Sequence, residues 1–411
     1  MTNKKFKLAA MSLATAVAVS AVGPSASAVT YYLGDGSVTV DKDDTRGAYS
    51  YQGEDGSEPN RTYVNEDTED NGVINVKGGN APTEEGMPPT DNSDNGTEET
   101  TSTDHTTDSS ADNTENSTTT ETTTPNTITV KEDVTGATIV VNDVNVDTST
   151  QTDPPAEVSA DTKEDKTIIK VGEGAKVDLT VKDSNLTTGG NGIDIGVNLK
   201  DKDDNKETKV DLTLDNTDIN LTEKANTAGI VARDHSTVNV TLKGENTIDG
   251  KEALEDAAKE AEEAKKEGKS SPNRNVEGIR VGGEGAGDGS GTSEGAKTHL
   301  TISGGVKKTE TAEADTEKTE SPAGGSLTIS ETTGGLVMAV GSDVEITDGA
   351  DVTIEDTKTS SSTQAGRAVT QHGDLTLSGG SSLTIDGVED NKVPHIGIGI
   401  ASWDDITVED G

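Results

Sequence analysis

The chain has 411 residues, a net charge of −43 at neutral pH and no cysteine. That charge argues against nucleic acid or an anionic membrane as a partner, because both are bound through basic patches. Without cysteine there are no disulfides and no thiolate metal sites. With one Phe and one Trp in the whole chain, the core must consist of Val, Ile, Leu and Ala, which suits a slim interior lined by β-branched residues.

Residues 1–28 are predicted to be a secretory signal. Three lysines come first, an apolar stretch runs over 8–22, and Ala26-Ser27-Ala28 is a small-x-small cleavage site. The apolar stretch is too short for a membrane-spanning helix, and the sequence contains no longer one. We therefore expect an exported bacterial protein, secreted or at the cell surface, with no membrane span in the visible chain.

Residues 29–78 contain short strand candidates among acidic turns and are expected to form an N-terminal β segment. Residues 79–126 are rich in Thr, Ser, Asn, Asp and Glu. A segment of this composition has too few apolar side chains to offset the entropy of ordering, so it is predicted to be a disordered linker.

From residue 127 onward one phrase recurs: a polar residue, an apolar residue, Thr and another apolar residue. It begins at Asp178, Asp211, Asn239, His299, Asp374 and Asp405. Alternation with period two is typical of a strand with one buried face. Its recurrence identifies the segment as a repeat structure.

The strand candidates group into rungs of three. A strand with Gly-Ile or a related pair comes first (192–193, 229–230 and 278–279 are examples), then the Thr phrase, then a shorter strand. Uninterrupted rungs are about 30 residues long, within the range of solenoid repeats. We therefore predict an all-β fold, a right-handed parallel β-helix with three strands per rung over residues 127–411.

The strand pattern is interrupted at residues 251–269, and it stops at the C-terminal end of the sequence. Residues 251–269 are rich in Ala, Glu and Lys and are predicted to form a helical insertion, either solvated or binding a partner. Solenoids need capping ends, and none is visible before Gly411. We expect that the sequence is a fragment with a truncated C-terminus, or that a partner covers this end.

Stacking the rungs predicts two columns of outward side chains. One holds Asp178, Asp211, Asn239, His299, Asp343, Asp374 and Asp405, and the next holds Thr180, Thr213, Thr241, Thr301, Glu345, Thr376 and Thr407. Carboxylates on adjacent strands lie about 4.8 Å apart and repel one another, which bound cations would relieve. We predict ligand binding by Asp178, Thr180, Asp211, Thr213, Asn239 and Thr241. Asp178, Asp211, Asp374 and Asp405 are candidate Ca²⁺ ligands; no cofactor is required. The alternative is a hydrated face without bound ions.

Two further features remain open from the sequence. Trp403 could stack on a sugar or plug the end of the solenoid. Arg233-Asp234-His235 is a compact polar trio, either a rung corner or an acid/base site. Superficial likenesses to polygalacturonase fragments occur at 216–218, 371–373 and 404–405, but their order is wrong and the Arg-Ile-Lys element is absent. No catalytic residue is assigned.

The chain resembles the secreted, carbohydrate-binding-domain-containing β-helix surface proteins of Gram-positive anaerobes. The likeness rests on Tyr31-Tyr32-Leu33, on Gly36-Ser37-Val38-Thr39-Val40, on the Thr/Asp-rich segment and on cassettes such as 238–248. The resemblance implies an extracellular or cell-surface location and binding of a glycan or host ligand. It supplies no catalytic residues.

These observations predict a non-enzymatic, secreted or cell-surface binding protein, adhesin-like or carbohydrate-binding, that presents an acidic Asp/Thr face. Two alternatives stay open. One is a polysaccharide-degrading β-helix enzyme, a lyase or glycosidase; the other is a purely structural stalk.

Overall fold

The computed structural model describes residues 29–43, 46–53, 61–64, 73–80, 123–150, 166–197, 206–223, 226–269, 275–283, 297–305, 324–358, 366–388, 398–402 and 404–409. The predicted signal (1–28), most of the predicted linker (81–122) and Trp403 lie outside the described residues.

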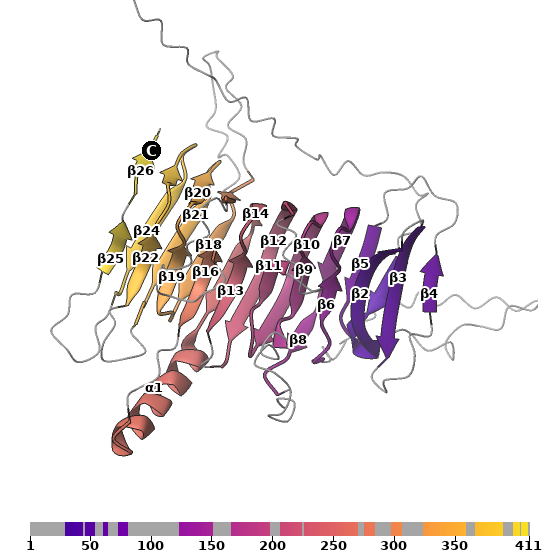
Figure 1. Ribbon diagram of the computed structural model, residues 1–411, viewed down its shortest axis with the longest axis horizontal. Helices are drawn as coiled ribbons and strands as arrows, with labels where there is room; N and C mark the ends of the chain where they lie inside the picture. Colours follow the sequence, from indigo (N-terminus) through magenta and orange to yellow (C-terminus); the bar gives the residue numbers. More distant parts are fainter. Residues whose placement is uncertain are drawn as a thin grey trace, which may run out of the picture.

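The described strands form two sheets that run along the length of the molecule (Figure 1). Sheet A contains β1 (Val29–Tyr32), β5 (Val73–Lys77), β7 (Thr135–Asn142), β8 (Asn145–Asp147), β10 (Lys176–Thr188), β12 (Thr208–Leu221), β14 (Ser236–Lys243), β15 (Glu245–Asp249), β17 (Thr298–Ser303), β18 (Ser326–Ser330), β20 (Ser342–Thr347), β21 (Asp351–Glu355), β23 (Leu375–Leu377), β24 (Ser382–Asp386) and β26 (Ile406–Val408). Sheet B contains β2 (Gly36–Asp43), β3 (Arg46–Gly53), β4 (Arg61–Val64), β6 (Ile128–Val130), β9 (Ile169–Gly172), β11 (Ile193–Val197), β13 (Thr227–Ala232), β16 (Val276–Val281), β19 (Gly334–Met338), β22 (Arg367–Gln371) and β25 (Ile398–Ser402).

Strands that neighbour each other within a sheet come from successive rungs and pair in parallel, as β10 with β12 and β13 with β16. The antiparallel pairs among the described strands are β2 with β3 and β3 with β4, at the N-terminal end. The chain therefore alternates between the sheets as it climbs, and the predicted parallel β-helix is confirmed. Its right hand stays a prediction from the general crossover preference.

The second and third strands of a rung both belong to sheet A. In the two central rungs they merge into the long strands β10 and β12, which bend at Asp183 (φ 46°) and Asn216 (φ 52°). Asp and Asn tolerate this left-handed conformation better than other side chains that carry a Cβ. In the neighbouring rungs the same corner separates β7 from β8 and β14 from β15.

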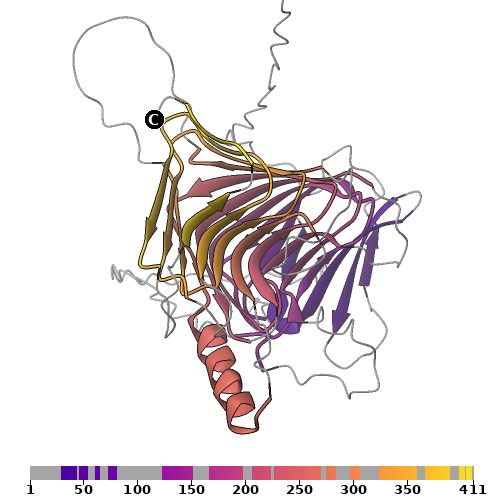
Figure 2. The ribbon, with the colours of Figure 1, turned by 60° about the vertical axis from the view of Figure 1, so that its left-hand side comes forward.

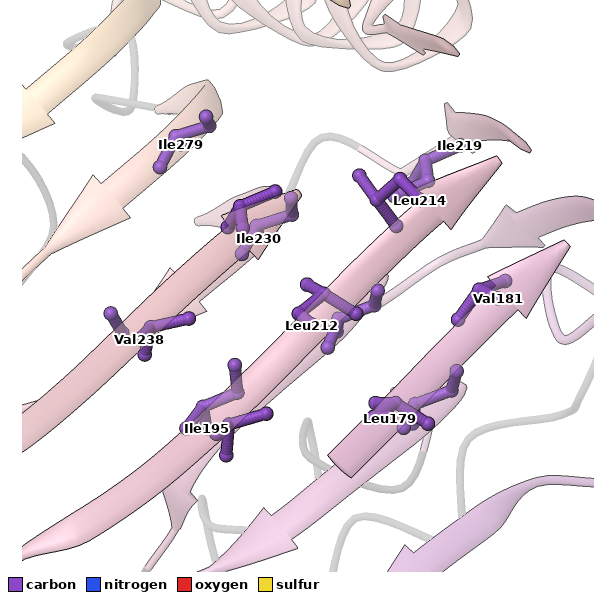
Figure 3. Close-up of a cluster of buried hydrophobic side chains, with 14 of the residues drawn as sticks. Leu179, Val181, Ile195, Leu212, Leu214, Ile219, Ile230, Val238 and Ile279 are labelled. Atoms are coloured by element: carbon purple, nitrogen blue, oxygen red, sulfur yellow. The ribbon is translucent and has the colours of Figure 1, made fainter. Parts of the chain in front are cut away.

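Aliphatic side chains from both sheets fill the interior. Leu179 of β10 lies in register with Leu212 of β12, and both are fully buried. Figure 3 shows them with Ile195, Ile230 and other members of one continuous cluster. Alternate residues of β10 and β12 point into this cluster, as the period-two pattern predicted.

The Gly-Ile motif has a packing reason. Gly192, Gly229, Gly278 and Gly335 form a ladder in sheet B, opposite Ile219, Ile248, Ile329 and Ile354 of the third-strand column. A Cβ placed at Gly278 would lie 2.3 Å from Ile329 Cγ2 and 2.5 Å from the carbonyl oxygen of Gly335. The glycines thus let sheet B approach the opposite wall, because the space of a side chain is already occupied.

The solenoid starts earlier than residue 127. Strand β5 pairs with β7 and β2 pairs with β6, so these two N-terminal strands extend the same two sheets. Leu33, a member of the short helix η1 (Leu33–Asp35), is fully buried in the common core. The expected boundary between an N-terminal β segment and the solenoid is therefore wrong.

The helical insertion is confirmed as α1 (Lys251–Lys266), which projects from the solenoid (Figures 1 and 2). In the first half of α1, the side chains of Ala253, Leu254 and Ala257 are buried. Within the part of the chain that the structure describes, no helix has the length and apolar character needed to cross a membrane.

Candidate functional site

Three exposed polar side chains form a ladder on sheet A. Asp178 of β10, Asp211 of β12 and Asn239 of β14 occupy one register position, and Asn239 Nδ2 donates a hydrogen bond of 2.6 Å to Asp211 Oδ1. Two positions further along the strands lies a second ladder, which consists of the half-buried Thr180, Thr213 and Thr241. The structure therefore brings together all six predicted ligand-binding residues of the sheet. We call them the Asp/Thr face.

The longer column predicted from the sequence is wrong beyond β14. Asn239 pairs with Thr301, and His299 pairs with Thr237, so the register differs by two residues. The Asp178 column continues as Thr301, Glu345, Thr376 and Thr407. His299 instead continues the column of Lys176, Lys209 and Thr237, and Asp343 follows it.

Small residues buried at the start of each strand explain the shift. Thr208, Ser236, Thr298 and Ser342 occupy one inward position at this corner and are all nearly inaccessible. The phrase begins three residues after this position in β12 and β14, but one residue after it in β17 and β20. Both spacings keep the apolar residues inside, so alternation alone cannot distinguish them.

The four predicted metal ligands consequently separate. Asp178 and Asp211 are neighbours on the Asp/Thr face. Asp374 and Asp405 precede the paired residues Leu375 and Ile406 and lie in the His299 column, at the C-terminal end of sheet A. Among the described residues, no three His, Asp or Glu side chains are grouped closely enough to hold a metal ion.

The carboxyl group of Asp178 has a raised pKa. Partial burial raises the pKa of its carboxyl above the ordinary value, and the charge of Asp211 raises it further. The charged form is therefore disfavoured in the folded protein. Stability from this group is present below the pKa of the unfolded chain and is lost as pH rises through the folded pKa.

Replacing Asp178 with Asn should accordingly raise the melting temperature at pH 7. The gain should be small, about 1–2 °C, because solvent screens an exposed carboxylate pair. The gain should vanish at about pH 3, below the ordinary aspartate pKa, where the native carboxyl is already protonated. Thermal melts of both proteins at the two pH values provide the test. An Asn variant that melts below the native protein at pH 7 would contradict this assignment.

The Arg233-Asp234-His235 trio is engaged in corner contacts. Arg233 donates two hydrogen bonds of 2.8 Å to Asp194, from Nε to Oδ1 and from Nη2 to Oδ2. Asp234 Oδ1 accepts from the backbone N–H of Gly283 at 2.7 Å. His235 adopts φ 61° in the turn before β14. These contacts favour the rung-corner interpretation over the acid/base site.

Two ion pairs with buried carboxylates on sheet B strands escaped the sequence analysis. Asp194 is 1% exposed beneath Arg233, and Glu277 is 2% exposed beside Arg280, whose Nε donates to Glu277 Oε2 at 2.5 Å. The Arg280 Nη2 atom is buried and has no hydrogen-bond partner among the described residues. The available signal was the presence of charged residues inside otherwise apolar Gly-Ile strands.

A hollow of about 160 Å³ lies at the left-handed corner of sheet A. It is lined by Asp143, Val144, Asn145, Asp183, Ser184, Asn185, Asn216 and Asp218, which come from three successive rungs. We call it the corner hollow. The sequence offered only turn signals here, because these residues lie 30 to 40 positions apart and meet only when the rungs stack.

Neither a protein-family model, nor a curated protein, nor a solved structure matches this chain.

Proposed function

We propose that this protein is a secreted or cell-surface binding protein without catalytic activity, and that the Asp/Thr face binds a glycan. The observation that carries the proposal is the double ladder across β10, β12 and β14, in which exposed carboxylate and amide groups lie beside half-buried hydroxyl groups. Adjacent groups repeat at the strand spacing of about 4.8 Å on a rigid sheet. Such a surface offers hydrogen bonds to the hydroxyls of an extended polar chain.

The composition of the face sets the expected strength of binding. No aromatic side chain belongs to these ladders, so the stacking that strengthens many sugar sites is absent from them. Recognition through exposed polar groups alone is weak for each contact, because water competes for every hydrogen bond. Several contacts along one polymer would raise the avidity.

A glycan array tests this proposal with the native chain beside the double variant Asp211→Ala/Thr213→Val. Both substitutions lie at outward positions, so the core stays unchanged, and Val suits a strand. The native chain should bind at least one glycan class, and the variant should bind it at least tenfold more weakly. Equal binding by the two proteins would refute the Asp/Thr face as the site. Binding to no glycan would favour the structural stalk.

We further propose that Asp178 and Asp211 bind Ca²⁺ weakly. The raised pKa of the Asp178 carboxyl supports this, because a cation would relieve part of the repulsion that raises it. Calcium takes six to eight oxygen ligands, so water would have to supply most of them here. Calorimetric titration should give heat with Ca²⁺ that the Asp178→Asn variant lacks. No heat, and melting unchanged by chelator, would refute it.

The enzyme alternative has a direct test. Incubation of the native chain with pectin or with mucin should release no sugars. Clear turnover of either polymer would overturn the non-enzymatic assignment.

A further inference from the structure

Two lysines border the Asp/Thr face. Lys176 of β10 and Lys209 of β12 pair in register and are exposed. They precede Asp178 and Asp211 by two positions, so all four side chains leave the same side of sheet A. The two lysines lie on adjacent strands, which are about 4.8 Å apart. We call them the lysine pair.

The aspartates beside the lysine pair do not neutralise it. Among the described residues Lys176 makes no ion pair. Lys209 Nζ lies 3.2 Å from Glu207 Oε1, but both side chains are half exposed, and an ion pair of this kind is weak. The pKa of the Asp178 carboxyl is raised, whereas an ammonium in contact with it would lower this pKa. Both ammonium groups can therefore take an acceptor from a ligand.

The surface around the lysine pair differs in charge from the chain as a whole. The chain has 77 acidic residues against 34 basic ones, but four outward positions on each of β10, β12 and β14 hold four lysines and three aspartates. These positions are Lys176, Asp178, Thr180 and Lys182 of β10, Lys209, Asp211, Thr213 and Asp215 of β12, and Thr237, Asn239, Thr241 and Lys243 of β14. Salt screens exposed charges beyond about 8 Å, so this local balance decides whether an anionic group can approach.

The two rows ask for different groups on one ligand. An ammonium can only donate hydrogen bonds, and an ionised carboxylate can only accept them. The row of the lysine pair and the row of Asp178 and Asp211 are about 7 Å apart along the strands. A ligand that spans both rows must therefore bring an acidic acceptor to the lysines and hydroxyl donors to the aspartates.

We propose that the glycan bound by the Asp/Thr face is a polyuronate, and that the carboxylate of one uronic acid residue accepts hydrogen bonds from Lys176 and Lys209. The hydroxyls of the sugars donate to Asp178 and Asp211. This inference rests on the proposed function and names the ligand class of that same face.

Charge density separates this ligand from nucleic acid. Duplex DNA carries one negative charge per about 1.7 Å of its axis, and two lysines cannot neutralise that density. A polyuronate carries one carboxylate on each sugar and keeps several uncharged hydroxyls beside it. Such a polymer suits a face in which lysines, aspartates and threonines alternate.

Calorimetric titration of the full chain tests the inference with hexamers of galacturonate and of mannuronate, each beside its methyl ester. The ester has the same ring and hydroxyls without the charge. At least one free acid should bind, and its ester should bind at least tenfold more weakly. Binding of the free acid should weaken as salt rises, since the lysines are exposed.

The double variant Lys176→Gln/Lys209→Gln should lower the affinity for the free acid at least tenfold and should no longer distinguish the acid from its ester. Gln keeps a long polar side chain at these outward positions, so the core stays unchanged. Lys265→Gln/Lys266→Gln is the matched control. It removes two adjacent, exposed lysines from the last turn of α1, and it should bind as the native chain does.

Three results would overturn the inference. They are binding of neither free acid, equal binding of acid and ester by the native chain, and undiminished binding of the acid by the lysine variant. A chain that binds only a neutral glycan, and loses it in Asp211→Ala/Thr213→Val, would reject the polyuronate and keep the proposed function. Failure of one is thereby distinguishable from failure of the other.

Discussion

Replacing Glu277 with Leu should lower the free energy of unfolding by about 3–5 kcal/mol. Glu277 is 2% exposed and Arg280 is 8% exposed, and the change removes the carboxylate that accepts from Arg280 Nε. Arg280 Nη2 already lacks a partner within the part of the chain that the structure describes. The variant would therefore leave a buried guanidinium without the Glu277 carboxylate as its counter-charge and acceptor. Loss of one member of a buried pair typically costs this amount.

The double variant Glu277→Leu/Arg280→Met is the matched comparison. Removing both charges replaces the pair with apolar side chains of similar size, and such replacements are often neutral or stabilising. Urea unfolding of the native chain, both single variants and the double variant completes the cycle. Hydrogen exchange at β16 should be read in parallel, because a solenoid can unfold by parts. If the free energy of unfolding of Glu277→Leu lay within about 1 kcal/mol of the native value, the pair would not stabilise the fold as predicted.

Replacing Gly278 with Ala should destabilise the protein by about 3 kcal/mol or more, although Ala is ordinarily the better strand residue. The new Cβ would lie 2.3 Å from Ile329 Cγ2 and 2.5 Å from the carbonyl oxygen of Gly335. Both contacts lie deep inside van der Waals separation, and one partner is backbone. Sheet B would have to move away from the third-strand column, which overpacks or opens the core.

Gly399→Ala is the control for Gly278→Ala. Gly399 continues the same ladder beyond Ala368, and among the described residues a Cβ there would meet only Ile385 Cγ2, at 3.8 Å. Ala368 itself shows that the ladder admits a methyl group where the opposite wall leaves room. The control should change stability by less than about 0.5 kcal/mol. Thermal melts of the two variants that show equal losses would contradict the close-approach explanation.

The fold class followed from side-chain periodicity, because sheet A strands such as β10 and β12 bury one set of alternate residues. The helix α1 could also be predicted, because Ala, Glu and Lys favour a helix over a strand. The register of β17 against β14 could not be predicted from the periodicity. The shift of two residues, which pairs Asn239 with Thr301, leaves every side chain on the same face of the sheet. The deciding residues were the buried hydroxyls of Thr208, Ser236 and Thr298 at the corner, which sequence reasoning had not separated from ordinary strand threonines.

The candidate site could be predicted only where its residues belong to the recurring polar-apolar-Thr-apolar motif. Asp178, Asp211 and Asn239 belong to consecutive rungs with equal spacing from the corner, so the prediction that they adjoin is confirmed. The corner hollow and the buried ion pairs join residues from turns and from apolar strands that share no phrase. Their proximity depends on how long each rung is, and the insertions between rungs obscure this in the sequence.

The central claim is that the Asp/Thr face of sheet A binds a glycan. The most direct measurement is the affinity of the native chain for its strongest array ligand, compared with that of the Asp211→Ala/Thr213→Val variant, with thermal melts to verify folding. We predict at least a tenfold loss of affinity in a variant that melts within a few degrees of the native chain. Unchanged affinity in that folded variant would contradict the claim.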